Sequence, residues 1–537
     1  MERYFINVDG GLFMFNDINR RVVNKKFIVF TQEEIDKCFT LQDLMKFKKF
    51  QEITVEEYNE SLGNIVVNRE VDRTPDKESY RVIAEQLSPD RNVSIDPRRV
   101  DAEIKKYPSN FIKEAANNSI FIEDREESKS QKQEMKSTTS SASFGEATQA
   151  KPKKREVWWC GPAQDAGGYG KMNRECIERL YKKGAKVQLF QPDNLLPDFR
   201  STVKATSSLK EMLGNVVSED APSVWGVMPP VYFPRNSKKI LFTMMETATL
   251  PKSFANKCNQ ANEIWLPSNS NMDMFKKSQE DGDLDKNISL VHMPLGANTD
   301  LYKPFIPTDE QKSLFNIKTK GFVFLSLFGW SLRKGVDVLF KAYLQEFTKE
   351  DDVTLLIVSR KDGCASPEKN KEIRDQIKEY ISRWSSLENH PHIVHIGEAI
   401  PEEQLPILYN MSNCHALVSR GEGFALTLLE SGSCEVPCIA TRCGGQLDFL
   451  NDDNSELIDI EGYGPGSQEI KCISSYYESA PFAVLGEKAT NQLKERMRYV
   501  TNNYSEAKSK AKLLRENIVQ NFTWDILADK VEKQLFG

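Results

Sequence analysis

The chain has 537 residues, a formal net charge of -6, 39% hydrophobic residues and 28% charged residues. This composition is that of a globular protein long enough for about two to four domains, and the negative charge argues against a dedicated nucleic-acid-binding protein. No apolar run approaches the roughly 18 residues of a membrane span, and the amino terminus lacks the apolar core of a signal peptide. We therefore predict a cytoplasmic protein without a transmembrane segment, and leave peripheral contact with a membrane open.

The first part of the chain, residues 1–123, opens with alternating apolar runs that predict a small β-meander, followed by charge-rich helical patterns. We expect a small α+β accessory domain, whose role in binding, targeting or assembly the sequence leaves open. Residues 124–156 are polar, rich in Ser and Thr and almost free of aliphatic side chains. They predict a disordered linker, because too little apolar surface is available to offset the entropy of ordering.

After the linker, short apolar runs alternate with amphipathic helical patterns. In the clearest helix, "KGVDVLFKAYLQEF" (residues 334–347), six apolar residues share one face. Strands that alternate with helices over this length predict parallel sheets with helices on both sides. We predict an α/β fold of two Rossmann-like domains, residues 157–304 and 305–515, facing each other across a cleft. Ligands of such sheets bind beyond the carboxyl ends of the strands.

One such strand end carries two glutamates, in the stretch "SRGEGFALTLLE" (residues 419–430). Glu422 lies between glycines in a loop, and we expect the helix that contains Glu430 to begin at about Phe424. Glycines let the backbone approach a ligand, and the first N–H groups of a helix suit a phosphate. About 10 Å of helix would separate the two carboxylates. This separation favours two carboxylates that hold two parts of one long ligand. The alternative is that Glu430 is an ordinary surface residue.

This stretch, followed by "SCEVPCIATRCGGQLDFL", resembles the signature of retaining glycosyltransferases of the GT-B fold, glycosyltransferase family 4. That signature includes an E-x7-E motif. Upstream, "FVFLSLFGWSLRKGVDVLFKAYLQEF" is similar to the family's donor-phosphate loop, and "GPAQDAGGYGKMNRE" to its first glycine-rich loop. Near the end, "NFTWDILADKVEKQL" resembles the closing helix, so residues 516–537 should cross back to the first domain. The resemblance covers roughly residues 155–537 and implies GT-B architecture.

The resemblance also implies a role for each matching residue. Glu422 would contact hydroxyls of the transferred sugar, and Glu430 would contact the ribose of the nucleotide. Lys334, together with Arg333, would neutralise the diphosphate, whose charge develops as the glycosidic bond breaks. The family pattern has a further Arg several residues before this Lys, where the chain reads "GWSL", and Arg333 can substitute for it.

Residues near these side chains should bind the donor through the backbone. Gly423, Phe424 and Ala425 would offer N–H groups to phosphate. Gly167 and Gly168 would let the first loop close over the phosphates or the sugar, although an ordinary turn is the alternative.

Two further residues have open roles. Glu246, in "MMETATLP", corresponds to a part of the cleft where many family members have a histidine. Whether Glu246 has a catalytic role or lies outside the site is open. Arg420 binds the donor or else caps or braces the loop that carries Glu422.

The resemblance implies a retaining hexosyltransferase that uses a UDP- or GDP-sugar and forms an α-glycosidic bond without a cofactor. Its acceptor would be a glycan, a lipid, a protein or a modified nucleic acid, and its oligomeric state is open. The alternatives are a non-catalytic protein that binds sugar nucleotides or glycans, and an epimerase or phosphorylase of the same fold. We predict no metal site, because neither "DGDLD" (residues 281–285) nor "CEVPCIATRC" has a suitable ligand spacing.

Overall fold

The computed structural model describes five strands between residues 2 and 53, and residues 154–191, 203–229, 237–361, 366–471, 473–478 and 480–537. The chain divides into two compact units, residues 1–149 and 150–537. In the first unit, β1 (Glu2–Asn7) pairs antiparallel with β4 (Phe27–Thr31) and β5 (Phe50–Ile53), and β2 (Phe13–Phe15) pairs with β3 (Arg20–Val22). Most of the predicted accessory domain and linker lies outside the described residues.

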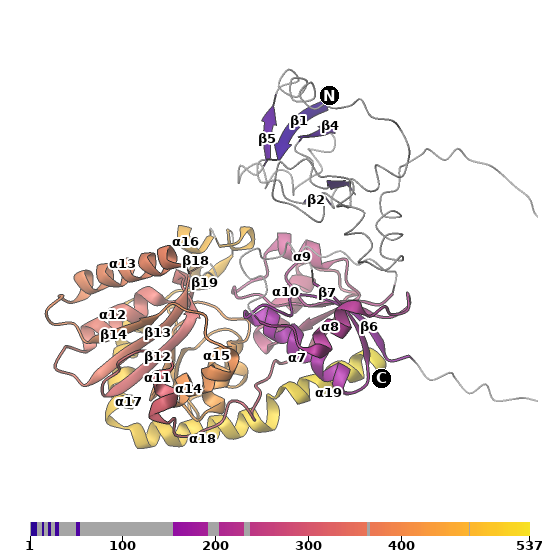
Figure 1. The fold of residues 1–537 in the computed structure, drawn as a ribbon. Helices are drawn as coiled ribbons and strands as arrows, with labels where there is room; N and C mark the ends of the chain where they lie inside the picture. The colour runs from indigo at the N-terminus through magenta and orange to yellow at the C-terminus, as the bar shows by residue number, and fades with distance from the viewer. Residues whose placement is uncertain are drawn as a thin grey trace, which may run out of the picture. The chain divides into compact units, whose positions relative to one another are not determined.

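The second unit begins with an amino-terminal lobe built on a six-stranded parallel sheet (Figure 1). Its strands, in the order β11-β10-β9-β8-β6-β7, are β6 (Glu156–Cys160), β7 (Lys186–Phe190), β8 (Ser223–Trp225), β9 (Lys239–Phe242), β10 (Glu263–Leu266) and β11 (Ser289–His292). The helices of this lobe are α7 (Gly168–Lys182), α8 (Ser207–Gly214), α9 (Lys252–Cys258) and α10 (Asn269–Glu280). Most residues of the central strands β6, β8, β9 and β10 are apolar and buried, because helices cover a parallel sheet on both faces.

The carboxy-terminal lobe repeats this architecture. Its parallel sheet, in the order β14-β13-β12-β15-β16-β17, contains β12 (Phe322–Gly329), β13 (Val353–Arg360), β14 (His392–Ile396), β15 (Cys414–Leu417), β16 (Cys438–Thr441) and β17 (Glu456–Ile458). Its helices are α11 (Asp309–Ser313), α12 (Val336–Glu346), α13 (Pro367–Trp384), α14 (Leu405–Asn410), α15 (Leu426–Ser433), α17 (Glu487–Asn502) and α18 (Tyr504–Asn521).

Two parallel six-stranded α/β sheets confirm the predicted fold class for this part of the chain. The predicted helix at residues 334–347 is α12, and all six of its predicted apolar residues are buried. One boundary was wrong: the helix after Glu422 begins at Leu426 rather than at Phe424. Ala425 has a φ of 67°, in the left-handed region, so the helix cannot extend back through it.

The last helix, α19 (Trp524–Phe536), packs on α7 of the amino-terminal lobe (Figure 1). Trp524, Leu527 and Val531 on one face of α19 are buried. Asp525 accepts a hydrogen bond from Arg179 of α7 at 2.7 Å. The end of the chain therefore ties the two lobes together. Among the described residues, no helix is both long and apolar enough to cross a membrane.

A further segment of the carboxy-terminal lobe, residues 463–483, is named the arm here. It contains β18 (Tyr463–Pro465), the short helix α16 (Gln468–Lys471), a single 3₁₀ turn at Ser475–Tyr477, and β19 (Pro481–Ala483), which pairs antiparallel with β18. The arm lies between β17 and α17 and is not part of the parallel sheet.

Candidate functional site

The candidate site lies where β12 and β15 end. These strands are parallel neighbours, so their carboxyl ends meet at one edge of the sheet. A 3₁₀ turn at Leu332–Lys334 follows β12, and the loop with Glu422 follows β15. Gly335 packs so tightly that a Cβ atom there would lie 1.9 Å from the carbonyl oxygen of Val418, and its φ of 69° favours glycine. This close contact joins the two loops.

Glu422 and Lys334 form a buried ion pair in this position. Nζ of Lys334 lies 2.6 Å from Oε1 of Glu422, whose side chain is 7% exposed. Burial acts to raise the pKa of Glu422, but the charges of Lys334 and Arg333 outweigh it and hold this pKa below its usual value. Burial lowers the pKa of Lys334, opposed by Glu422 and reinforced by Arg333. Glu422 is therefore ionised at neutral pH and accepts hydrogen bonds.

Arg333 connects this pair to the amino-terminal lobe. Its Nη1 donates to the carbonyl oxygen of Gly421 at 2.6 Å and lies 3.9 Å from Oε1 of Glu422. Its Nη2 lies 3.9 Å from Oε1 of Glu246, in the loop after β9. A Cβ atom on Gly421 would come within 1.8 Å of the carbonyl oxygen of Glu246. The structure thus brings together all four predicted catalytic residues, two carboxylates and two cations.

The predicted phosphate-binding residues adjoin Glu422 in the chain. Gly423 lies against the side chain of Met244 from the other lobe. A Cβ atom on Gly423 would lie 2.8 Å from the nearest atom of that side chain. The ring of Phe424 packs against Phe449 at 5.5 Å between centroids, which turns this side chain inward. Ala425 holds its left-handed conformation at the start of α15. Such a conformation in a non-glycine residue costs about 1–2 kcal/mol and is found at functional sites more often than elsewhere.

Glu430 belongs to a second buried group. Its Oε1 lies 2.5 Å from Nζ of Lys171, and its Oε2 accepts a hydrogen bond from the Tyr409 hydroxyl at 2.8 Å. Lys171 also lies 2.7 Å from Glu402 and 3.0 Å from the Tyr302 hydroxyl. Although burial opposes it, the charge of Glu430 helps to raise the pKa of Lys171 well above its usual value.

Lys171 itself was not predicted from the sequence. It lies in the first turn of α7, three residues after Gly168, and its backbone N–H donates to the carbonyl oxygen of Gly167 at 2.9 Å. A lysine in the first turn of a helix that follows a glycine loop is the signal that could have identified it. The glycine loop and Glu430 are thereby connected through one side chain.

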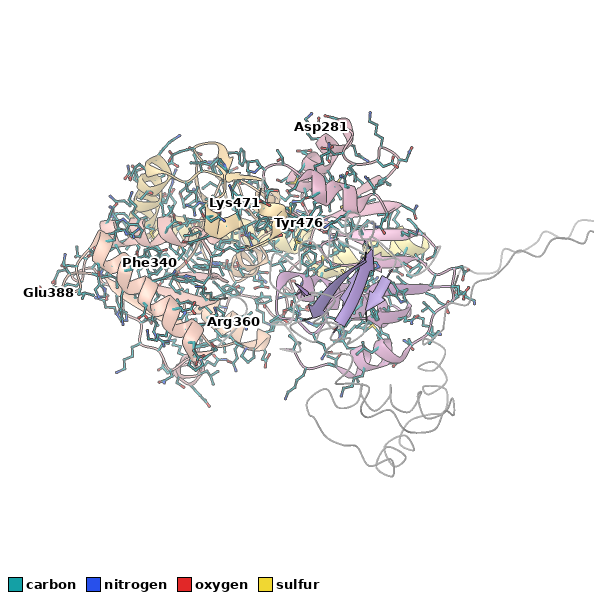
Figure 2. All side chains as sticks on the ribbon, turned by 90° about the horizontal axis from the view of Figure 1, so that it is seen from above. Asp281, Phe340, Arg360, Glu388, Lys471 and Tyr476 are labelled. Atoms are coloured by element: carbon teal, nitrogen blue, oxygen red, sulfur yellow. The ribbon has the colours of Figure 1, made fainter. Side chains whose placement is uncertain are left out.

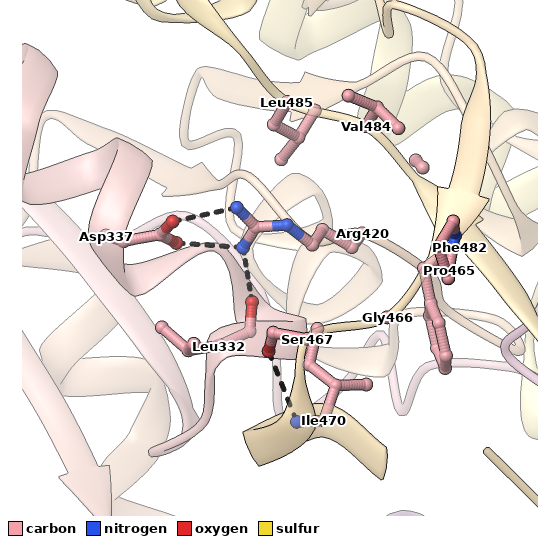
Figure 3. A pocket seen from close by; sticks show the side chains of 11 residues that line it. Leu332, Asp337, Arg420, Pro465, Gly466, Ser467, Ile470, Phe482, Val484 and Leu485 are labelled. Carbon is pink, nitrogen blue, oxygen red and sulfur yellow. Dashed lines mark hydrogen bonds and ion pairs between the residues drawn. The ribbon is translucent and has the colours of Figure 1, made fainter. Parts of the chain in front are cut away.

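Arg420 lies in a third environment (Figure 3). Its guanidinium donates two hydrogen bonds of 2.8 Å to Asp337 and one to the carbonyl oxygen of Leu332. On its open side is a pocket of about 210 Å³, lined mainly by apolar residues of the arm and of the segment after it. With these contacts, Arg420 braces the loop that carries Glu422.

In the described part of the chain, no group of three or more His, Cys, Asp and Glu residues is placed to hold an ion. Asp281 and Asp283 of the acidic loop pair with Lys277 and Lys252 instead, each at 2.6 Å.

The two parallel six-stranded α/β sheets match the architecture of solved GT-B glycosyltransferases. Residues 307–461 match the family of glycosyl transferases group 1. The carboxy-terminal lobe therefore contains a domain of that family, glycosyltransferase family 4.

Similarity to individual proteins is more limited. A stretch of 158 residues is 27% identical to the D-inositol 3-phosphate glycosyltransferase of Corynebacterium kroppenstedtii and covers 29% of this chain. The chain thus spans about a third (33%) of the length of that curated relative. A solved glycosyltransferase of Rickettsia africae is 16% identical with a TM-score of 0.50, over 71% of this chain and 99% of that one. The Anabaena protein HepE, solved in complex with UDP and glucose, is 13% identical with a TM-score of 0.46, over 71% and 99%.

Proposed function

We propose that the chain is a retaining glycosyltransferase that transfers a hexose from a UDP- or GDP-sugar to an acceptor and forms an α-glycosidic bond. The observation that carries this proposal is the buried cluster of Glu422, Lys334 and Arg333 at the ends of two adjacent parallel strands. Ligands of α/β sheets bind at this edge. A cationic pair held next to an ionised carboxylate suits a donor with a diphosphate at one end and sugar hydroxyls at the other.

The charges suggest how each group acts. As the bond between the sugar C1 and the diphosphate oxygen breaks, negative charge accumulates on the leaving diphosphate. Lys334 and Arg333 stabilise that charge because they are already fixed in place before the reaction. Glu422 stays ionised, so it cannot donate a proton to the leaving group and serves as an acceptor for sugar hydroxyls.

The acceptor oxygen then forms the new bond to C1 on the same face. Its proton passes to an oxygen of the departing diphosphate. This step needs no general base from the protein.

Thermal shift with a panel of UDP-, GDP- and ADP-sugars provides the first test. A ligand at about 100 times its Kd adds roughly 2.7 kcal/mol of stability, which gives a clear rise in Tm. The second test measures release of the nucleoside diphosphate from the best donor, with water as the acceptor. Wild type should release it and Glu422→Gln should not.

The outcomes separate this proposal from its alternatives. Binding without release, with glycan, lipid, protein and nucleic-acid acceptors as well as with water, would indicate a non-catalytic protein. An epimerised donor would indicate an epimerase, and a requirement for free phosphate would indicate a phosphorylase. If no nucleotide sugar raises the Tm, the proposal is wrong.

A further inference from the structure

The arm reaches from the carboxy-terminal lobe onto the amino-terminal lobe. Its Ile470, Tyr476 and Phe482 share a buried apolar cluster with residues of that lobe. The Tyr476 ring meets the Phe254 ring of α9 edge-on, with 5.0 Å between centroids, and its hydroxyl donates to the carbonyl oxygen of Pro229 at 2.7 Å. In Figure 1 the arm lies next to α9, and Figure 2 labels Tyr476 where the two lobes meet.

The neighbouring Tyr477 makes a different contact. Its hydroxyl lies 2.8 Å from Oε2 of Glu246, one of the four residues of the candidate site. Its ring packs edge-on against Phe482 of the same arm, at 5.1 Å between centroids. Burial, followed by the charge of Glu246, raises the pKa of Tyr477 well above its usual value. The phenol therefore stays protonated and donates the hydrogen bond to the carboxylate.

Glu246 is thus held at two points by two segments of the opposite lobe. Tyr477 holds Oε2, and Arg333 faces Oε1 at 3.9 Å. A glutamate side chain has three rotatable bonds, so a single contact leaves the second oxygen free to turn. Two contacts determine the plane of the carboxylate. Because Tyr477 is on the arm, this arrangement exists only when the arm lies on the amino-terminal lobe.

We propose that Tyr477 is a positioning residue of the transfer reaction, which holds the Glu246 carboxylate with one oxygen turned toward Arg333. The inference rests on the proposed function, because it assigns Glu246 to the reacting site. Contact of the arm with the amino-terminal lobe therefore determines how Glu246 of that lobe is oriented.

Two single substitutions on the arm form a matched pair. Tyr477→Phe removes the hydroxyl on Glu246 and keeps the ring on Phe482, whereas Tyr476→Phe removes the hydroxyl that donates to the carbonyl oxygen of Pro229. With UDP-glucose as the probe, we expect Tyr477→Phe to lower the rate of UDP release about 10- to 100-fold, because small misplacements of a site residue are costly. The Kd of UDP should change by less than about twofold. Tyr476→Phe should keep the rate within about twofold of wild type.

A double-mutant cycle tests whether Tyr477 acts through Glu246. In a Glu246→Ala background, Tyr477→Phe should cause no further loss of rate, since its partner is gone. Equal losses in Tyr477→Phe and Tyr476→Phe, or additive losses in the cycle, would overturn the proposal and leave the transferase function intact.

The same four proteins of the cycle can be compared by Tm, which does not depend on turnover. The fall in Tm caused by Tyr477→Phe should at least halve in the Glu246→Ala background, and an unchanged fall would again overturn the proposal. If wild type releases no UDP from UDP-glucose and binds none of the nucleotide sugars, the proposed function fails, and the Tm cycle alone decides whether Tyr477 positions Glu246.

Discussion

The ammonium of Lys171 lies 2.5 Å from a carboxylate oxygen of Glu430, and this buried ion pair joins the two lobes. The side chains are 8% and 5% exposed. Glu402 and the Tyr302 hydroxyl take the two remaining donor positions of the ammonium, so each of its hydrogens has a partner. Each oxygen of Glu430 has a partner, Lys171 or Tyr409, and a carboxylate oxygen can accept a second hydrogen bond, such as one from a ribose hydroxyl.

The first prediction concerns the stability that this pair confers. Lys171→Met leaves the carboxylates of Glu430 and Glu402 without their shared cation, and breaking a buried pair in this way costs about 3–5 kcal/mol. Urea unfolding should show a loss of this size. Lys183→Met, at the end of the same helix, removes a more exposed partner of Asp529 and should cost about 0–1 kcal/mol. Similar losses in both variants would contradict the assignment.

The second prediction tests the expected contact of Glu430 with ribose. Glu430→Gln weakens a charge-assisted hydrogen bond, which is worth about 1.5–3 kcal/mol, so the Kd of UDP should rise roughly 10- to 100-fold. Isothermal titration calorimetry measures this directly. Glu403→Gln, at an exposed glutamate, serves as the control and should bind UDP like wild type. An unchanged Kd in Glu430→Gln would show that Glu430 serves only the ion pair with Lys171.

The third prediction concerns the leaving group. In the proposed mechanism, Lys334→Met removes a fixed cation next to the diphosphate, and losses of this kind lower kcat about 10²- to 10³-fold. The control is Lys341→Met, on α12, whose ammonium pairs with the exposed Glu487. Steady-state kinetics with a saturating nucleotide sugar distinguishes the two. A variant with normal kcat and a raised KM alone would place Lys334 in donor binding rather than in bond breaking.

The fourth prediction concerns pH. Burial acts to raise the pKa of Glu402, but Lys171 and Arg174 outweigh it and hold this pKa below its usual 4.5. The folded state then binds the proton of Glu402 less readily than the unfolded state. Its stabilisation is present above pH 4.5 and is lost as the pH falls through the folded pKa.

Measured as the free energy of unfolding, the difference between wild type and Glu402→Gln should therefore shrink between about pH 7 and about pH 3. Glu403→Gln should show no such trend relative to wild type. A difference that stays constant over this range would contradict the role of Glu402 as a charged partner of Lys171.

Much of the fold could be predicted from the sequence, because local periodicity reports directly on burial. Apolar runs predicted the long strands, such as β12 and β13, and the periodicity of α12 predicted which of its faces is buried. The short strands β8 and β17 escaped notice, since three residues are too few to display a pattern. The start of α15 was misplaced, since the left-handed conformation of Ala425 is imposed by its surroundings rather than by its own preference.

The candidate site was predictable to the same extent. Lys334 and Glu422 follow two neighbouring parallel strands, so the order of elements alone brings them to one edge of the sheet. The partners Lys171–Glu430 and Tyr477–Glu246 are 259 and 231 residues apart, and each links one lobe to the other. No local pattern encodes such pairs, because they depend on how two separately folded sheets meet. Only the tertiary structure therefore decided which side chain faces each of these two carboxylates.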